Sequence, residues 1–235
     1  ETAAVLFETI PATLGMPLPP DDFYKEVREV CDEKDVLLIL DEIQTGLGRT
    51  GKLWGFEHYN VVPDIIAIGK GLSGGLYPIT ATCYREDLDS FMNENPFIHV
   101  STFGGAEIGC VVGAEVLDIV SSEAFLKNVR DLSTSIIDAL SPLKEKYPDI
   151  FHEIRNKGLF MGLRMSDLGY GPLMSIACIN NGIFAVYADN NRSVLQFLPP
   201  LILDEKDIPY LTESMDKAFK YAEARPEYVE LARSL

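Results

Sequence analysis

Two short apolar runs constrain the fold of this chain more than any other feature, because each of them ends in a charged residue. The run VLLIL at 36–40 leads to Asp41, and the run IIAIG at 65–69 leads to Lys70. An apolar run without alternation is typical of a strand buried on both faces, which is common in parallel sheets. Open α/β sheets bind ligands at the carboxyl ends of such strands. The sequence therefore predicts a cofactor site that contains a carboxylate and an amine.

The neighbouring segments predict a βαβ unit around the first of these strands. Residues 3–7 are apolar enough for a strand, and Phe23, Val27 and Val30 form the apolar stripe of a helix that ends near residue 34. Strand, helix and strand in this order are expected to form a right-handed crossover. Residues 79–84 predict a fourth strand.

The pattern of apolar residues changes near residue 125. Helices are predicted at about 106–120 and 123–146, and the second of them carries an apolar face. Beyond it, short strands alternate with helices; the strands are expected at 154–156, 159–165 and 194–198, and the helices at 172–181 and 204–223. We therefore expect a larger domain with a mostly parallel sheet over residues 1–125 and a smaller α+β domain over residues 126–235.

Composition argues against several classes of function. The 36 acidic residues outnumber the 20 basic residues and give a net charge of −16, which argues against nucleic acid or an anionic membrane as a partner. No apolar run reaches the roughly 20 residues of a membrane span. The four cysteines are scattered without a metal-binding spacing, so we expect reduced, mostly buried thiols, no metal site and a cytoplasmic protein.

The chemistry of the two charged residues indicates a particular cofactor. Burial lowers the pKa of a lysine ammonium, as a lysine that forms a Schiff base requires. A carboxylate such as that of Asp41 can keep a pyridine nitrogen protonated, and the protonated ring then accepts an electron pair from an adjacent carbon. Lys70 and Asp41 together are therefore the expected equipment for pyridoxal phosphate (PLP). On spacing alone, an ordinary ion pair between strand ends is the more common explanation.

The residues around this pair resemble the signature of the class III aminotransferases, which are PLP enzymes of fold type I. The longest matching stretch reads LLILDEIQTGLGRTGKLWGFEHYNVVPDIIAIGKGLSGGLYPI. Further matching segments are FETIPATLGMPLPP before it and HVSTFGG, GLFMGLRM and FLPPLIL after it. The resemblance covers nearly the whole chain in the right order. It implies an α/β fold with a large domain, incomplete here, and a smaller C-terminal domain.

The resemblance also implies roles for individual residues of the cofactor site. Lys70 would form the Schiff base with PLP and, once released, move a proton between the substrate carbon and the cofactor. Asp41 would pair with the pyridinium nitrogen, and Gln44 would lie by the phenolic oxygen of the cofactor. Thr102, with Ser101 beside it, would bind the PLP phosphate of the neighbouring subunit. The active site would therefore be shared across a homodimer.

The resemblance implies that Glu8 and Gln196 are substrate-binding positions, and two residues here, Thr13 and Gln196, depart from the pattern of the family. Glu8 matches the first glutamate of an EPIQGEGG-like loop, but Thr13 replaces the second glutamate. Gln196 replaces an arginine that amino-acid-accepting members carry two residues before the LPP-like segment. In those members the arginine holds the substrate α-carboxylate and can pair with the missing glutamate, so losing both together is consistent. We expect a substrate that is not bound through that arginine, which argues against an ordinary ornithine-like or 4-aminobutyrate-like preference.

The function implied is transfer of an amino group from an amine or amino acid to a keto acid or aldehyde. The Lys–Asp pair does not separate this reaction from those of a PLP-dependent aminomutase, racemase or decarboxylase. Members of the family are much longer, so we expect a fragment that lacks the N-terminal half with its Gly/Ser-rich phosphate loop. Such a fragment alone would bind PLP weakly or not at all. A non-catalytic assembly module is the alternative from a different functional class.

Overall fold

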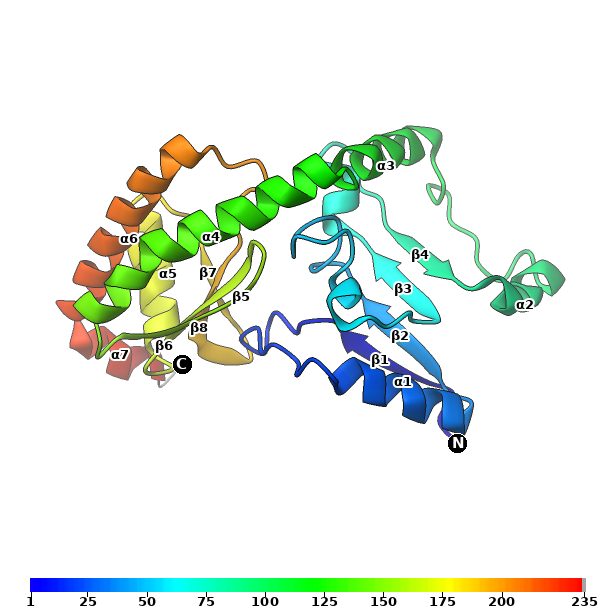
Figure 1. Cartoon of the computed structure of the whole chain (residues 1–235), viewed down its shortest axis with the longest axis horizontal. Coiled ribbons are helices and arrows are strands. Elements are labelled where there is room, and N and C mark those ends of the chain that lie inside the picture. The colour runs from blue at the N-terminus through cyan, green and yellow to red at the C-terminus, as the bar shows by residue number, and fades with distance from the viewer. Residues whose placement is uncertain (234–235) are drawn as a thin grey trace. The chain divides into compact units, whose positions relative to one another are not determined.

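The computed structural model describes residues 1–233, which form two compact units (Figure 1). Unit 1 contains Glu1–Thr9 and Pro19–Leu126, and unit 2 contains Ile10–Leu18 and the chain from Lys127 onward. The domains predicted at residues 1–125 and 126–235 stay a prediction. The compact units differ from them mainly in the segment Ile10–Leu18, which belongs with the second half of the chain.

The centre of unit 1 is a four-stranded sheet with the strand order β1-β2-β3-β4. Its strands are β1 (Ala4–Glu8), β2 (Leu37–Asp41), β3 (Ile65–Ile68) and β4 (Ala81–Tyr84). The first three strands are parallel, whereas β4 is antiparallel to β3 and forms an edge of the sheet. Helix α1 (Phe23–Lys34) connects β1 to β2, so the predicted βαβ unit is confirmed.

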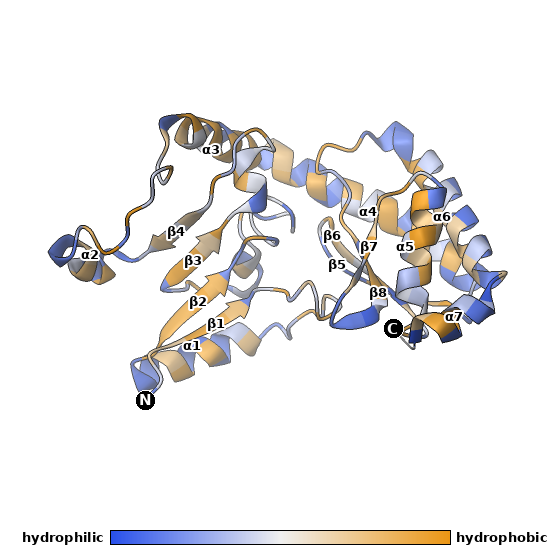
Figure 2. Ribbon diagram, turned by 180° about the vertical axis from the view of Figure 1, so that it is seen from behind, coloured by the Kyte–Doolittle hydropathy of each residue, from blue (hydrophilic) through white to orange (hydrophobic). Residues whose placement is uncertain are grey.

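The apolar runs form the strands because their side chains pack against α1 and the loop after β2. Leu38 and Leu40 are fully buried in a cluster with Tyr24 of α1 and with Tyr59. Figure 2 shows the strands as mostly hydrophobic ribbons, whereas α1 alternates between hydrophobic and hydrophilic residues. Only one face of β2 is fully buried, because Leu37 and the other alternate residues of the strand are half-buried. The expectation of burial on both faces is therefore wrong for this chain.

Several helices follow the strands of unit 1, and most of them are short. They are the 3₁₀ helices η1 (Gly55–Tyr59), η2 (Lys70–Ser73) and η3 (Glu86–Leu88) and the α-helices α2 (Ser90–Glu94) and α3 (Glu107–Val120). Helix α3 packs against η2 through small residues: a Cβ atom on Gly113 would lie 3.4 Å from a methyl group of Leu72. The segment that leads out of β3 is therefore held by α3.

Unit 2 contains an antiparallel sheet with the strand order β5-β6-β8-β7. Its strands are β5 (Phe151–Lys157), β6 (Phe160–Met165), β7 (Val186–Ala188) and β8 (Asn191–Phe197). Its helices are the later part of α4 (Glu123–Lys146), α5 (Tyr170–Asn180), the 3₁₀ helix η4 (Glu205–Asp207), α6 (Ile208–Glu223) and α7 (Pro226–Arg233). The apolar face of α4 is buried, and the ring of Phe219 in α6 stacks on those of Tyr147 and Phe151 at 5.3 and 4.9 Å.

The four cysteines are all free thiols. Cys31 and Cys178 are buried as expected, whereas Cys83 and Cys110 are exposed. The expectation of mostly buried thiols is therefore correct for only half of them. Within residues 1–233, none of the helices combines the length and the apolar character that a membrane crossing needs.

Candidate functional site

The carboxyl ends of β1, β2 and β3 form one edge of the sheet in unit 1. Glu8 at the end of β1 pairs in register with Asp41 at the end of β2, and Asp41 pairs with Ala67 in β3. Lys70 follows Ala67 by three residues and opens η2. The structure therefore brings Glu8, Asp41 and the start of the Lys70 segment to the same edge, where parallel α/β sheets bind ligands.

The backbone at Lys70 is strained. Its φ angle is 43°, in the left-handed region where a residue with a Cβ atom costs about 1–3 kcal/mol. Gly69 before it is extended and closely packed: a Cβ atom there would lie 3.3 Å from Thr80 and 3.6 Å from Ile43. Strained residues cluster at functional sites, so this conformation supports the choice of Lys70 as a functional residue.

The side chain of Lys70 is exposed. The expectation of a buried amine is therefore wrong for this chain. Lys70 lies beyond the last paired residue of β3, and its neighbours Gly69 and Gly71 have no side chains that could cover it. An exposed amine remains free to react, but the chain itself does not desolvate it.

The polar side chains at this edge form few hydrogen bonds within the protein. Oδ1 of Asp41 accepts the N–H of Ile43 at 2.8 Å, and the carboxylate is half-buried. Within residues 1–233, no hydrogen bond is made by the other carboxylate oxygen of Asp41, by the side-chain amide of Gln44 or by the amine of Lys70. These three groups are therefore available to a ligand.

Sequence reasoning missed the buried carboxylate of Glu42. Its exposed fraction is 1%, and it accepts four hydrogen bonds from neutral donors. The hydroxyl groups of Thr9 and Thr45 donate at 2.5 and 3.0 Å, and the backbone N–H groups of Gly55 and Phe56 donate at 2.8 and 3.0 Å. The signal in the sequence was the second acid of the DE pair at 41–42, which directly follows an apolar strand and has a threonine three residues later.

The pKa of Glu42 reflects two opposing effects. Burial raises the pKa of this carboxyl group above its ordinary value, and the hydrogen bonds from Thr9, Gly55, Thr45 and Phe56 oppose the rise without cancelling it. A carboxylate placed in such surroundings requires its complete set of donors, because each lost donor leaves a buried charge less compensated.

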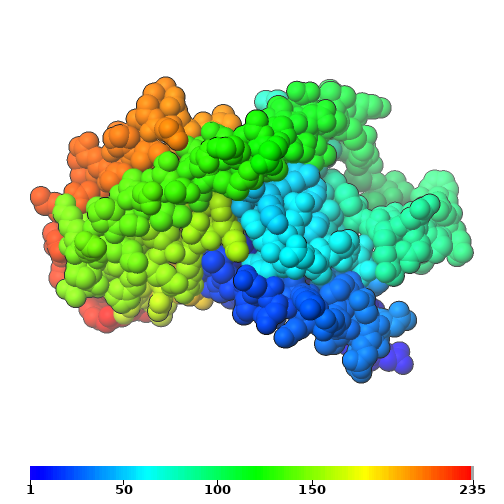
Figure 3. Space-filling model, in the orientation of Figure 1, coloured from blue at the N-terminus to red at the C-terminus, as the bar shows by residue number. Residues whose placement is uncertain are grey.

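The predicted phosphate-binding pair lies elsewhere in unit 1. Ser101 and Thr102 are exposed in the segment between α2 and α3 and do not lie at the ends of β1–β3. The Ser101 hydroxyl accepts the N–H of Gly104 at 3.1 Å. Apolar neighbours such as Phe97 and Phe103 are exposed as well, and Figure 3 shows the segment on the surface of unit 1. Ser101 and Thr102 thus lie outside β1–β3 and outside the turns that directly follow these strands.

Thr13 and Gln196, the two departures from the family pattern, both belong to unit 2. Thr13 accepts the backbone N–H of Asn190 at 3.0 Å and its side-chain amide at 3.2 Å. The side-chain amide of Gln196 donates to the carbonyl oxygen of Tyr187 at 3.2 Å. Both residues are therefore bound to the hairpin of β7 and β8, Tyr187 lying in β7 and Asn190 in the turn.

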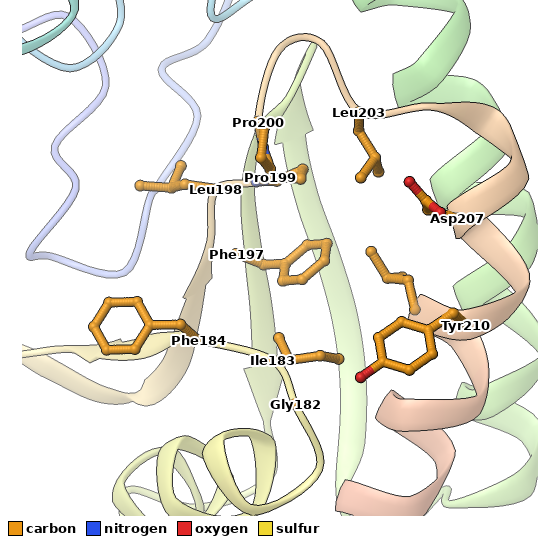
Figure 4. Close-up of a pocket in the computed structure, with 11 residues that line it drawn as sticks. Gly182, Ile183, Phe184, Phe197, Leu198, Pro199, Pro200, Leu203, Asp207 and Tyr210 are labelled. Atoms are coloured by element: carbon orange, nitrogen blue, oxygen red, sulfur yellow. The ribbon is translucent and has the colours of Figure 1, made fainter. Parts of the chain in front are cut away.

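A pocket of about 400 Å³ lies in unit 2 between the end of β8 and the start of α6 (Figure 4). Its walls are mainly apolar, with Ile183 and Phe197 toward the interior and with Asp207 and Tyr210 as polar groups on the α6 side. None of its lining residues is a lysine. It therefore lacks the amine that the predicted chemistry needs, and the candidate site remains the edge of the sheet in unit 1.

Comparison with known proteins shows that this chain is similar to aminotransferases. Residues 1–219 match the profile of the family described as "Aminotransferase class-III". The chain is 62% identical to an uncharacterized aminotransferase of Archaeoglobus fulgidus over 235 residues, which are all of this chain and 55% of that protein. It is 39% identical over 216 residues to the acetylornithine aminotransferase of Caldanaerobacter subterraneus subsp. tengcongensis, which are 92% of this chain and 53% of that protein.

Solved structures show the same similarity. An ornithine aminotransferase from Toxoplasma gondii, described with PLP at its active site in partial occupancy, superposes with a TM-score of 0.84 at 34% identity. The match covers 95% of this chain and 52% of that protein. The α/β fold of this chain is therefore the fold type I architecture of these enzymes. The chain spans about half the length of the relatives that it matches.

Proposed function

The chain belongs to the class III aminotransferases, and from that premise we propose that it transfers an amino group between an amine or amino acid and a keto acid or aldehyde. One observation carries the proposal: Asp41 ends β2 and Lys70 lies just beyond the neighbouring parallel strand β3, at one edge of the sheet. The relatives are described as aminotransferases or transaminases, which favours amino transfer over other reactions of the cofactor.

The residues at this edge fit PLP, the cofactor that class III aminotransferases use. The free carboxylate oxygen of Asp41 suits the protonated ring nitrogen, and the amine of Lys70 suits the aldehyde carbon. The side-chain amide of Gln44 would suit the phenolic oxygen of the cofactor. When bound, PLP supplies a cationic ring that accepts the electron pair of a broken bond at the substrate carbon.

The remaining steps fall to the side chains of the chain. Asp41, oriented by the N–H of Ile43, keeps the ring nitrogen protonated through its negative charge. Lys70 would hold the cofactor through its amine and would move a proton between the substrate carbon and the cofactor. With a keto acid or aldehyde as acceptor, Lys70 would move the proton in the opposite direction.

The substrate proposal rests on Thr13 and Gln196. Neither side chain carries a charge, and each forms a hydrogen bond with the hairpin of β7 and β8. Without a positive charge at residue 196, the protein would not hold an α-carboxylate in the manner of amino-acid-accepting relatives. We therefore propose a donor whose amine is not next to a carboxylate bound at this position.

We also propose that the active site is shared in a homodimer. Ser101 and Thr102 are exposed and lie apart from the strand ends, which supports a role in binding the cofactor phosphate of a second subunit. A cytoplasmic location is proposed from the four scattered free cysteines, because exported proteins oxidise such residues or lack them.

Chemical trapping at Lys70 tests the proposed function. The protein expressed from its complete gene is incubated with PLP and reduced with borohydride, and the modified lysine is mapped by mass spectrometry. We expect the label at Lys70 and loss of amine turnover in Lys70→Ala. Lys52→Ala is the matched control, because Lys52 lies in the same unit with its amine bonded to the carbonyl oxygen of Glu57. A Lys70→Ala protein that still turned over an amine donor would refute the proposal.

A further inference from the structure

The buried carboxylate of Glu42 takes no part in the chemistry proposed above. A buried carboxylate without a cationic partner costs free energy, and apolar residues of similar volume often stabilise a core better. The donors to Glu42 are two hydroxyl groups and two backbone N–H groups, and none of these four carries a charge. Stability alone therefore does not explain a glutamate at this position.

The hydrogen bonds of Glu42 connect the chain segments that carry the candidate site. Glu42 itself follows Asp41, and its donor Thr45 follows Gln44. Its donor Thr9 follows Glu8 at the end of β1. One carboxylate thus joins the ends of two strands to the start of the loop that leaves β2.

The backbone of Glu42 adds the third strand to this junction. Its N–H donates to the carbonyl oxygen of Ala67 in β3 at 2.9 Å, three residues before Lys70. Its carbonyl oxygen accepts the N–H of Gly46 at 2.9 Å. The hydrogen bonds of Glu42 therefore reach a residue next to Glu8, a residue next to Gln44 and a residue three positions before Lys70. Asp41 directly precedes Glu42 in the chain.

We infer that Glu42 is a positioning residue, which holds the carboxylate of Asp41 and the amide of Gln44 in place for the ring of the cofactor. The inference rests on the proposed function. Asp41 is the last residue of β2, so the strand alone does not fix its side chain against the loop that follows. Misplacing a reacting group by 1 Å can cost about 100-fold in rate, so a fixed junction at this point has a direct chemical use.

A pair of substitutions at Thr9 separates positioning from packing. Thr9→Val keeps the volume of the side chain and removes the hydroxyl donor to Glu42, whereas Thr9→Ser keeps the donor and removes a methyl group. In the protein from the complete gene, we expect Thr9→Val to raise the Kd for PLP, measured by absorbance, by about 5- to 10-fold, the worth of one hydrogen bond. Thr9→Ser is expected to change the Kd by less than about 2-fold. Thr45→Val and Thr45→Ser repeat the comparison at the other oxygen.

A second comparison uses another buried carboxylate, that of Asp64, which directly precedes β3. Asp64 accepts the N–H of Leu38 near the start of β2, whereas Glu42 directly follows the end of that strand. Glu42→Gln is expected to raise the Kd for PLP and to speed amide hydrogen exchange at residues 41–46. Asp64→Asn is expected to lower stability without changing the Kd. Unfolding of all variants is followed by the fluorescence of Trp54, so that each Kd is measured on folded protein.

The outcomes are distinct. A higher Kd in Thr9→Val and Glu42→Gln, but not in Thr9→Ser or Asp64→Asn, supports the inference. An unchanged Kd in Thr9→Val and Glu42→Gln, or an equal rise in Asp64→Asn, overturns it while the wild-type protein still labels Lys70. If the wild-type protein itself binds no PLP at Lys70, the proposed function fails, and the inference fails with it.

Discussion

Removing the carboxylate of Asp64 should destabilise unit 1 severely, although the residue lies far from the candidate site. Its exposed fraction is 6%, and it accepts the N–H of Leu38 at 2.7 Å. Its oxygens also bind Arg28 at 2.8 Å and Arg85 at 2.9 Å. One side chain thus connects β2 and α1 with the residue that follows β4.

The cost of Asp64→Ala can be estimated contact by contact. A buried N–H such as that of Leu38 left without an acceptor costs about 1–3 kcal/mol. Arg28 keeps a second partner, Asp32 at 2.7 Å. Breaking the contact between Arg28 and Asp64 therefore costs about 1–2 kcal/mol, well below the cost of breaking a fully buried ion pair. Arg85 is half-exposed and its contact contributes at most about 1 kcal/mol. We expect a total of about 3 kcal/mol, because alanine also relieves the cost of burying a charge.

The single tryptophan of the chain makes this prediction easy to check. Trp54 packs in unit 1, so its fluorescence during urea unfolding reports on that unit. Asp87→Ala is the matched control, since Asp87 binds the same guanidinium of Arg85 but is exposed. Its effect should stay below about 0.5 kcal/mol. A loss below about 1 kcal/mol in Asp64→Ala would refute the reasoning from buried hydrogen bonds.

The same carboxylate predicts a pH dependence of stability. Burial raises the pKa of Asp64, but the hydrogen bonds from Arg28 and Leu38 and the charges of Arg28 and Arg85 outweigh this effect and leave the pKa below its ordinary value. A group with a depressed folded-state pKa stabilises fully above its unfolded pKa of about 4 and loses this contribution as pH falls through the folded value. The stability difference between wild type and Asp64→Asn should therefore be constant from about pH 5 to 7 and shrink below about pH 4. A difference that grew on acidification would contradict this assignment.

Two further predictions concern unit 2. Gln196→Arg combined with Thr13→Glu should raise kcat/KM for donors with an α-carboxylate by about tenfold in steady-state assays, because one charge-assisted hydrogen bond is worth about that much. No gain in kcat/KM would count against the substrate proposal. Ile136→Ala on the buried face of α4 should cost about 2–5 kcal/mol by calorimetry, because Ile136 is fully buried, whereas Ile137→Ala at a half-buried position should cost clearly less. Equal losses of stability in Ile136→Ala and Ile137→Ala would show that the buried face of α4 is assigned wrongly.

Elements with a long or unbroken apolar pattern could be predicted from the sequence. Helix α4 begins at Glu123 and ends at Lys146 as predicted, despite Pro142 near its end, because buried residues recur along one face for its whole length. The strands β2 and β3 also match closely, since an apolar run of five residues has few alternatives inside an α/β sequence.

Elements that depend on distant partners could not be predicted. Strand β7 has only three residues, Val186–Ala188, and is irregular in its pairing with β8, so no local periodicity marks it. Helix α2 is a short exposed turn with no buried residue. The burial of Glu42 depends on donors at Thr9 and at Gly55–Phe56, which no spacing rule connects to an acid at a strand end.

The positions of the candidate residues in the sheet could be predicted from the sequence, but their environment could not. The sequence places Asp41 and Lys70 at strand ends, and the register of β2 with β3 agrees with that placement. It does not predict that Lys70 is exposed, because exposure depends on which segments lie over the turn after β3. The roles of Gln44, Ser101 and Thr102 stay predictions from the family resemblance.

The chain crosses between its compact units three times, after Thr9, Leu18 and Leu126. Ile10, Ala12 and Met16 are buried against Phe160 of β6, so the early loop completes the core of unit 2. A truncated protein that starts at residue 127 would lack the side chains that cover the ring of Phe160. We expect this protein to aggregate. An isolated unit 2 for crystallisation or display should therefore include residues 10–18, joined to the chain from residue 127 by a linker.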